Sequence, residues 1–113
     1  MPRPQLALLV QGSYYAITGL WPLVSMRSFE AVTGPKVDRW LVKMVGLLAL
    51  SNGLALLVGS RRERVSEETR VLAIASIFAF TAVDVVYAAK RRISPIYLAD
   101  AVAELALLVV LLG

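Results

Sequence analysis

Four long stretches of the chain carry almost no charged residue. They cover residues 5–24, 44–60, 71–89 and 93–113; the third contains one acid, Asp84, and the fourth contains Asp100 and Glu104. At 1.5 Å per residue, a helix over each stretch is about 25–31 Å long, close to the roughly 30 Å hydrocarbon layer of a bilayer. The pattern predicts four membrane-spanning helices, over about 5–24, 41–59, 70–89 and 95–112.

A soluble four-helix bundle is the alternative to this interpretation, and it needs a polar stripe along every helix. Residues 6–10 and 105–112 contain no polar residue, so neither segment can form such a stripe. The chain is also 58% hydrophobic and 18% charged, against roughly 45–50% and 25% in an average soluble domain. We therefore predict an all-α, polytopic membrane protein: one compact four-helix domain that takes up residues 1–113.

The connection between the first two spans predicts a short helix of a different kind. Over about residues 25–33, Met26, Phe29 and Val32 recur every third position, with polar and charged side chains between them. This spacing is typical of an amphipathic helix that lies in the headgroup plane. Residues 33–36, which include a glycine and a proline, should end it.

Two further helix ends carry recognisable signals. Ser66, followed by two glutamates and Thr69, resembles an N-terminal cap for the third span. Ser94-Pro95 would place a proline in the favoured first turn of the fourth span. Both signals agree with the boundaries set by the apolar stretches.

The basic residues divide unevenly between the two predicted faces of the membrane. Five lie on the face with the amino terminus and the 61–70 loop, and seven lie on the face with the 25–43 connection and residues 90–92. The positive-inside rule favours the second face as cytoplasmic, but this bias is small. An antiparallel or dual-topology dimer stays open. In a bacterium, we expect this multi-pass protein in the inner membrane.

The composition narrows the chemistry that the chain can perform. It has no cysteine and no histidine, which excludes disulfides, thiol or imidazole catalysis, and zinc sites of the usual kind. We expect no metal and no cofactor. The net charge of +4 is accounted for by loop residues, and we predict no nucleic-acid partner.

Acids inside a membrane-spanning helix are the strongest functional signal, because an ionisable group below the headgroups needs a partner, a bound proton or a wet cavity. The polar residues of the spans also share depths and faces. Glu104 would lie about 16 Å from the second face, near the bilayer midplane, and Asn52, Tyr14 and Tyr15 would lie at a similar depth. Residues three or four apart form a polar stripe on each of three spans, and these stripes predict a pocket that opens toward the second face. The stripes are Gln11, Tyr14 and Thr18; Thr81, Asp84 and Tyr87; and Tyr97, Asp100 and Glu104. The candidate ligand-binding or proton-coupling residues of this pocket are Glu104, Asp100, Asp84, Asn52, Tyr14, Tyr15, Thr18, Tyr87 and Tyr97.

Each of these residues also has a purely structural interpretation. Tyr87 and Tyr97 suit the membrane interface as anchors. Asp84 could pair with Lys90 or Arg91, and Asp100 with Arg92. Asn52 is typical of a hydrogen bond between helices. Glu104 is too deep to reach the surface, so its structural alternative is a hydrogen bond to Asn52 or to a tyrosine hydroxyl.

Small residues recur on every predicted span. They are Gly12 and Ala16; Gly46, Ala49 and Gly53; Ala75 and Ala79; and Ala99, Ala103 and Ala106. In lipid, such stripes let helix backbones approach closely and pack. They predict a compact bundle, with a stripe left over for a homodimer.

We expect a pocket lined by carboxylates to bind or transport a small cationic or amphipathic ligand, with the acids titrating as a coupled set that exchanges a proton for a cation. Two other functions stay open: a structural, accessory or lipid-binding bundle, and a membrane enzyme that acts on a lipid-like substrate by acid/base chemistry. The expected partners are membrane lipid, a small molecule and a second copy of the chain.

Overall fold

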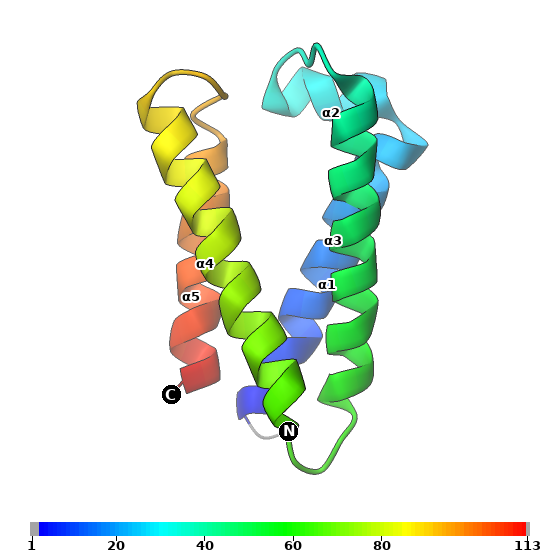
Figure 1. The fold of residues 1–113 in the computed structure, drawn as a ribbon, viewed down its shortest axis with the longest axis vertical. Coiled ribbons are helices and arrows are strands. Elements are labelled where there is room, and N and C mark those ends of the chain that lie inside the picture. The colour runs from blue at the N-terminus through cyan, green and yellow to red at the C-terminus, as the bar shows by residue number, and fades with distance from the viewer. Residues whose placement is uncertain (1–2, 113) are drawn as a thin grey trace.

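The computed structural model describes residues 3–112, and all regular structure within that range is helical. The helices are α1 (Arg3–Val24), α2 (Met26–Thr33), α3 (Arg39–Ser60), α4 (Glu67–Ala89) and α5 (Tyr97–Leu112). The four long helices stand alongside one another, and the short α2 lies at one end of the bundle (Figure 1). The predicted all-α fold, with a short helix between the first two long ones, is confirmed.

Two of the helices, α3 and α4, are long and apolar enough to cross a membrane. The other two long helices, α1 and α5, do not meet the same requirement of length and hydropathy. α5 has 16 residues, which makes it about 24 Å long, and α1 has a polar middle that includes Gln11, Ser13 and Tyr14.

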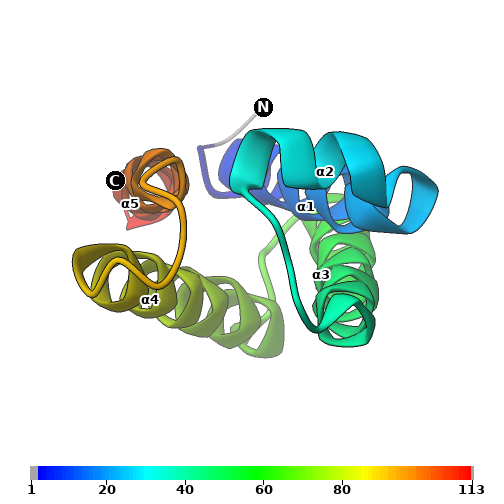
Figure 2. The same ribbon diagram turned by 90° about the horizontal axis from the view of Figure 1, so that it is seen from above.

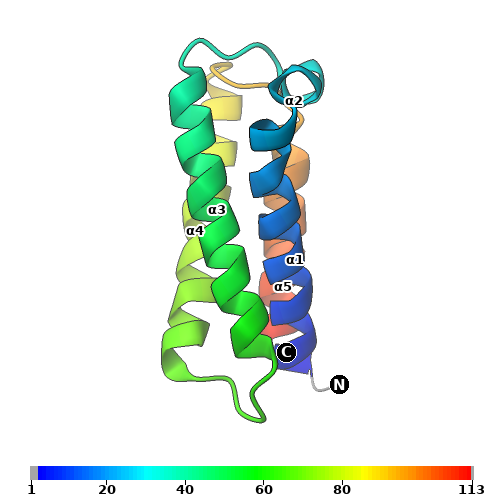
Figure 3. The same ribbon diagram turned by 90° about the vertical axis from the view of Figure 1, so that its right-hand side faces the viewer.

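The helices form two pairs, α1 with α3 and α4 with α5, and α1 also contacts α5. Seen from the side, α1 and α5 lie on one side of the bundle and α3 and α4 on the other (Figure 3). α3 and α4 contact each other little, although they follow one another in the chain. The side of the bundle formed by α3 and α4 is therefore packed more loosely than the α1–α3 and α4–α5 pairs.

Glycines set the close approach of α1 and α3. Gly12 and Gly19 on α1 face Gly53 and Gly46 on α3, and a Cβ on any of the four would lie within 3.0 Å of backbone atoms of the other helix. Ala49 is buried in the same contact. Ala75 and Ala79 are exposed on α4, so that part of the small-residue prediction does not describe packing inside the bundle.

Helix ends agree with the sequence signals in two of three cases. The Ser66 side chain accepts a hydrogen bond from the Thr69 backbone N–H at 3.1 Å, which confirms the cap of α4. Gly34 adopts a left-handed φ of 97° and its N–H donates to the Glu30 carbonyl, which ends α2. The start of the last helix was predicted two residues early. Pro95 lies in a tight turn before α5, where its carbonyl accepts from the Leu98 N–H at 2.9 Å.

α2 is fixed over the end of α1, as the view from above shows (Figure 2). The Trp21 indole N–H donates to Ser28 Oγ at 2.8 Å, and the Trp21 ring meets the Phe29 ring edge-on, with centroids 5.3 Å apart. Glu30 forms an ion pair with Arg39 at the start of α3, at 2.7 Å. These contacts hold α2 against both α1 and α3.

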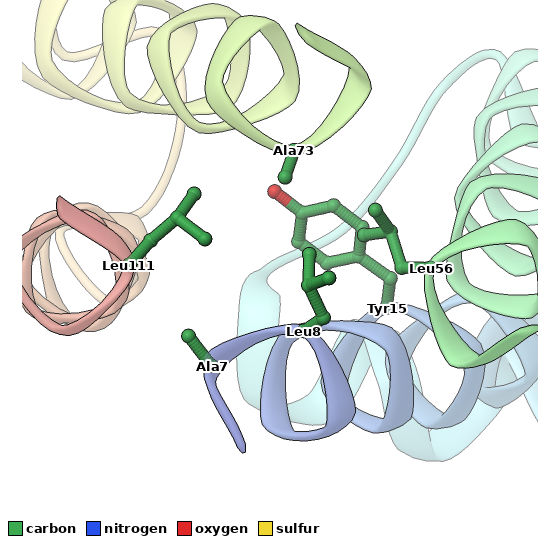
Figure 4. Close-up of a cluster of buried hydrophobic side chains, with 6 residues drawn as sticks. All are labelled: Ala7, Leu8, Tyr15, Leu56, Ala73 and Leu111. Carbon is green, nitrogen blue, oxygen red and sulfur yellow. The ribbon is translucent and has the colours of Figure 1, made fainter. Parts of the chain in front are cut away.

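An apolar core fills the bundle from its middle to the end opposite α2. Its buried members are Ala7, Leu8, Tyr15, Leu56, Ala73 and Leu111, contributed by all four long helices (Figure 4). Beyond them, the Gln5 side-chain amide donates to the Glu63 carbonyl at 2.7 Å and ties the α3–α4 loop to α1. This end of the bundle is therefore sealed by packing, and the open space lies toward α2.

Candidate functional site: a carboxylate-lined cavity

A cavity of about 310 Å³ lies inside the bundle, toward α2. All five helices line it, because α1, α3, α4 and α5 form its walls and α2 contributes Phe29, Val32 and Thr33. Its volume is at the lower end of the range for small-molecule sites.

The three acids predicted as a site all line this cavity: Asp84 from α4, and Asp100 and Glu104 from α5. Glu104 is 1% exposed and Asp84 is 4% exposed. Asp100 and Glu104 share one face of α5 because they lie four residues apart, and the pairing of α4 with α5 brings Asp84 to the same space.

Two tyrosines of α1 hold the α5 acids. The Tyr15 hydroxyl donates to Glu104 Oε2 at 2.8 Å, and the Tyr14 hydroxyl donates to Asp100 Oδ1. The Gln11 side-chain amide donates in turn to the Tyr15 hydroxyl and to the Ala73 carbonyl, each at 3.1 Å. Glu104 therefore has the tyrosine partner that its structural interpretation requires, and it also faces the cavity.

Asp84 differs from the other two acids because one of its oxygens, Oδ2, is buried and has no hydrogen-bond partner. No ion pair joins it to Lys90 or Arg91 within residues 3–112, nor does one join Asp100 to Arg92. The Lys90 ammonium instead lies 5.8 Å from the centroid of the Tyr87 ring. The simple electrostatic pairings proposed for these acids are absent from the described structure.

Seven of the nine predicted site residues line the cavity, including Tyr14, Tyr15, Thr18 and Tyr97. Thr18 donates its hydroxyl to the Tyr14 carbonyl of its own helix at 2.6 Å. Asn52 and Tyr87 lie elsewhere. Asn52 donates to Ser76 Oγ at 3.3 Å, a hydrogen bond between α3 and α4, and Tyr87 is 42% exposed.

Sequence reasoning missed several aromatic residues that line the cavity and a lysine that lies over one of its rings. Phe80 lines the cavity and meets the Tyr15 ring edge-on at 5.2 Å. Phe80 lies four residues before Asp84 on α4, and this spacing alone could have placed it on the same face of the helix. Trp21 and Phe29 line the α2 end, and Lys36 lies over the Tyr97 ring at 4.9 Å; no local pattern indicated these contacts.

The other groups in the cavity wall indicate which kind of ligand the acids could bind. Within the described range, no three acids, histidines or cysteines lie close enough together to hold a metal ion. The cavity walls are mostly aromatic and aliphatic, with carboxylates and hydroxyls as the polar groups. Such a lining suits an organic cation, which gains from both charge and aromatic contact.

Comparison of the chain with known families, with curated proteins and with solved structures finds no match. The class that the structure defines is an all-helical bundle with an internal acidic cavity.

Proposed function

We propose that this chain is a small multi-pass membrane protein whose cavity binds a small organic cation and releases protons when it does so. The observation that carries the proposal is the convergence of Asp84, Asp100 and Glu104 on one cavity, with a buried oxygen of Asp84 left without a partner. A buried acceptor without a donor is costly, and an ammonium ligand would supply the donor.

The outer surface of the bundle supports a membrane location. Apolar side chains along α3 are 40–61% exposed: Leu41, Met44, Val45, Leu47, Leu48, Leu54 and Val58. Soluble monomers rarely expose continuous apolar surface on this scale. In this proposal lipid covers α3 and α4, and α1 and α5 complete four spans.

The proposed chemistry follows from the charges inside the cavity. No lysine or arginine lines it, so nothing in its walls neutralises the three acids. Close carboxylates in a poorly solvated space favour bound protons or a bound cation. Binding a cation therefore competes with binding protons, and this competition would couple the ligand to the proton gradient.

A structural role is the second candidate, and a specific observation favours it. Both acids of α5 are held by tyrosines of α1, so these acids could serve to join the two helices. The Asp84 carboxyl group also interacts with that of Asp100, but a purely structural network does not need a buried Asp84 oxygen that lacks a donor. The two functions therefore differ most clearly at Asp84.

The test uses the purified protein in lipid nanodiscs, with Trp40→Phe as the background so that Trp21 in the cavity wall is the single tryptophan. Ethylammonium is the probe, and its binding is followed by Trp21 fluorescence and by calorimetry in two buffers that differ in ionisation enthalpy. We expect saturable binding with release of about one proton per cation.

Variants decide between the two candidates. Asp84→Asn should weaken binding about tenfold or more, because a charge-assisted hydrogen bond is lost. Glu63→Gln, a loop acid at the opposite end of the bundle, is the matched control and should bind as the parent does. If no ammonium probe binds to a folded parent protein, the structural role stands and the binding function is wrong.

A further inference from the structure

The cavity meets the surface at four aliphatic residues. Val32 of α2, Val45 of α3 and Ile96 just before α5 line the cavity and are 50%, 51% and 45% exposed, and Ala99 of α5 lines it and is exposed as well. Two of the three acids, Asp84 and Glu104, are almost fully buried, and Asp100 is partly exposed. Residues that both line the cavity and reach the exterior mark its mouth.

Polarity therefore runs in an unusual direction along this cavity. The two buried acids, Glu104 and Asp84, lie at its deep end, where they are 1% and 4% exposed, and aliphatic side chains are the most exposed part of its lining. A site that takes a hydrophilic ion from water has no need of an aliphatic mouth. A mouth of this composition suits a ligand that passes from, or stays partly within, an apolar phase.

The position of the mouth agrees with such a phase. Val45 belongs to the apolar outer surface of α3, beside Met44 and Leu48. On the other side of the mouth, α2 is amphipathic, because Phe29 and Val32 line the cavity while Arg27 is exposed. In the proposed membrane, the mouth then lies near the boundary between headgroups and acyl chains, where amphiphiles concentrate.

We propose that the ligand is a single-chain amphiphile with a primary ammonium head, whose head reaches the free oxygen of Asp84 while its alkyl chain leaves through Val32, Val45 and Ile96 into the bilayer. This inference rests on the proposed function, because it names the ligand class and its orientation in the same cavity. A primary ammonium group fits the head position because its N–H groups can donate hydrogen bonds to Asp84 Oδ2, an acceptor that has no donor in the described structure.

The test compares ethylammonium with octylammonium on the same nanodisc protein, with the signal from empty nanodiscs subtracted. Octanoate, which has a comparable chain and the opposite charge, is the control for simple partition into lipid. We expect both ammonium probes to bind and octanoate not to bind. Octylammonium should have the lower aqueous Kd by about tenfold or more, because each methylene group removed from water contributes about 0.8 kcal/mol.

Enlarging the mouth residue then separates chain from head. Val45→Phe should weaken octylammonium binding about tenfold more than it weakens ethylammonium binding, because a larger ring at the mouth obstructs the path of the chain and lies away from the head position. Val58→Phe is the matched control, since Val58 is 61% exposed on the same helix and does not line the cavity. Val32→Phe repeats the test from α2 if the first variant folds poorly.

The outcomes distinguish the two levels of the proposal. Ethylammonium binding without octylammonium binding, equal binding of octanoate, or equal loss of both ammonium probes in Val45→Phe and Val32→Phe would each overturn the amphiphile inference and leave the cation site intact. Absence of binding by every ammonium probe would instead overturn the proposed function itself.

Discussion

A Cβ atom added to Gly46 would lie 2.6 Å from the backbone oxygen of Gly19, so the backbones of α3 and α1 touch at this point. The same relationship recurs two turns along, where a Cβ on Gly53 would lie 2.6 Å from the backbone oxygen of Gly12. In an apolar solvent, close backbone packing is a main source of helix association. The α1–α3 pair is therefore the tightest part of the bundle and one wall of the cavity.

Gly46→Ala should destabilise the protein by about 2 kcal/mol, because the added methyl must push the two backbones apart. Alanine favours a helix by roughly 0.8–1.0 kcal/mol over glycine, so helix propensity alone predicts the opposite sign. The free energy of unfolding in mixed micelles measures the change. Ser51→Ala, at an exposed position of the same helix, should leave stability nearly unchanged, and a stabilising Gly46→Ala would show that the contact is not tight.

Tyr15→Phe tests the hydrogen bonds that join α1 to α5. The substitution keeps the ring that meets Phe80 and removes the donor to Glu104. We expect a loss of about 1 kcal/mol, since hydrogen bonds between helices in a membrane contribute up to about 1–2 kcal/mol. Tyr87→Phe, in a half-exposed ring outside the cavity, is the control. Equal stabilities for the two variants would contradict a joining role for Tyr15.

Much of the architecture could be predicted from where charges are absent. The helix over 70–89 is found at Glu67–Ala89, and the cap at Ser66 was visible in the sequence. The last helix was predicted to start at Pro95, two residues before its actual start at Tyr97, because a proline suits both a first helical turn and the tight turn before it. Short-range signals of this kind do not separate the two conformations.

The candidate site was predictable wherever helical spacing places residues on one face. Asp100 and Glu104 lie four apart, and both face the cavity. Asn52 was predicted at the depth of Glu104, but depth says nothing about rotation of the helix, and its amide points to Ser76 of α4. The role of α2 in lining the cavity depends on how residues 34–38 turn back, which periodicity does not encode.

Asn52→Leu should therefore leave the cavity unaffected. It removes one long hydrogen bond, 3.3 Å between Asn52 Nδ2 and Ser76 Oγ, and such bonds average about 0.6 kcal/mol in membrane bundles. We expect a loss of stability of that order and an unchanged Kd for ethylammonium. If Asn52→Leu weakened cation binding as strongly as Asp84→Asn does, then Asn52 would belong to the site.

The connection from α2 to α3 should loosen at low pH. Glu30 accepts a hydrogen bond from the Lys36 backbone N–H at 3.2 Å and pairs with Arg39, and these contacts hold its pKa below the ordinary value of 4.5. A lowered pKa means that the contacts stabilise the folded connection at neutral pH. They are lost as the pH falls below 4.5 and through the lowered value.

A spin label on a cysteine at Val37, which is 97% exposed, reports the mobility of this connection. Its spectrum should sharpen as the pH falls through that range. Glu30→Gln should be mobile at every pH and show no such transition. A transition that persists in Glu30→Gln would have to arise from other acids, such as those of the cavity.

Cysteine labelling tests the four spans directly, because the natural chain contains no cysteine. In sealed vesicles, single cysteines at Glu63 and at Val37 should react with a membrane-impermeant maleimide from opposite sides, since these loops lie at opposite ends of the bundle (Figure 1). A cysteine at Val58, which is 61% exposed on α3, should resist the reagent because lipid covers it.

Three other labelling patterns would contradict four spans in a single orientation. If the cysteines at Glu63 and Val37 were both labelled from the same side of the membrane, the population would not have four spans in a single orientation. If both loop sites were labelled from both sides while Val58 stayed protected, the chain would insert in two opposite orientations, as its small difference in basic residues allows. Rapid labelling of all three positions in the absence of detergent would place the outer surface of α3 in water and remove the basis for a membrane protein.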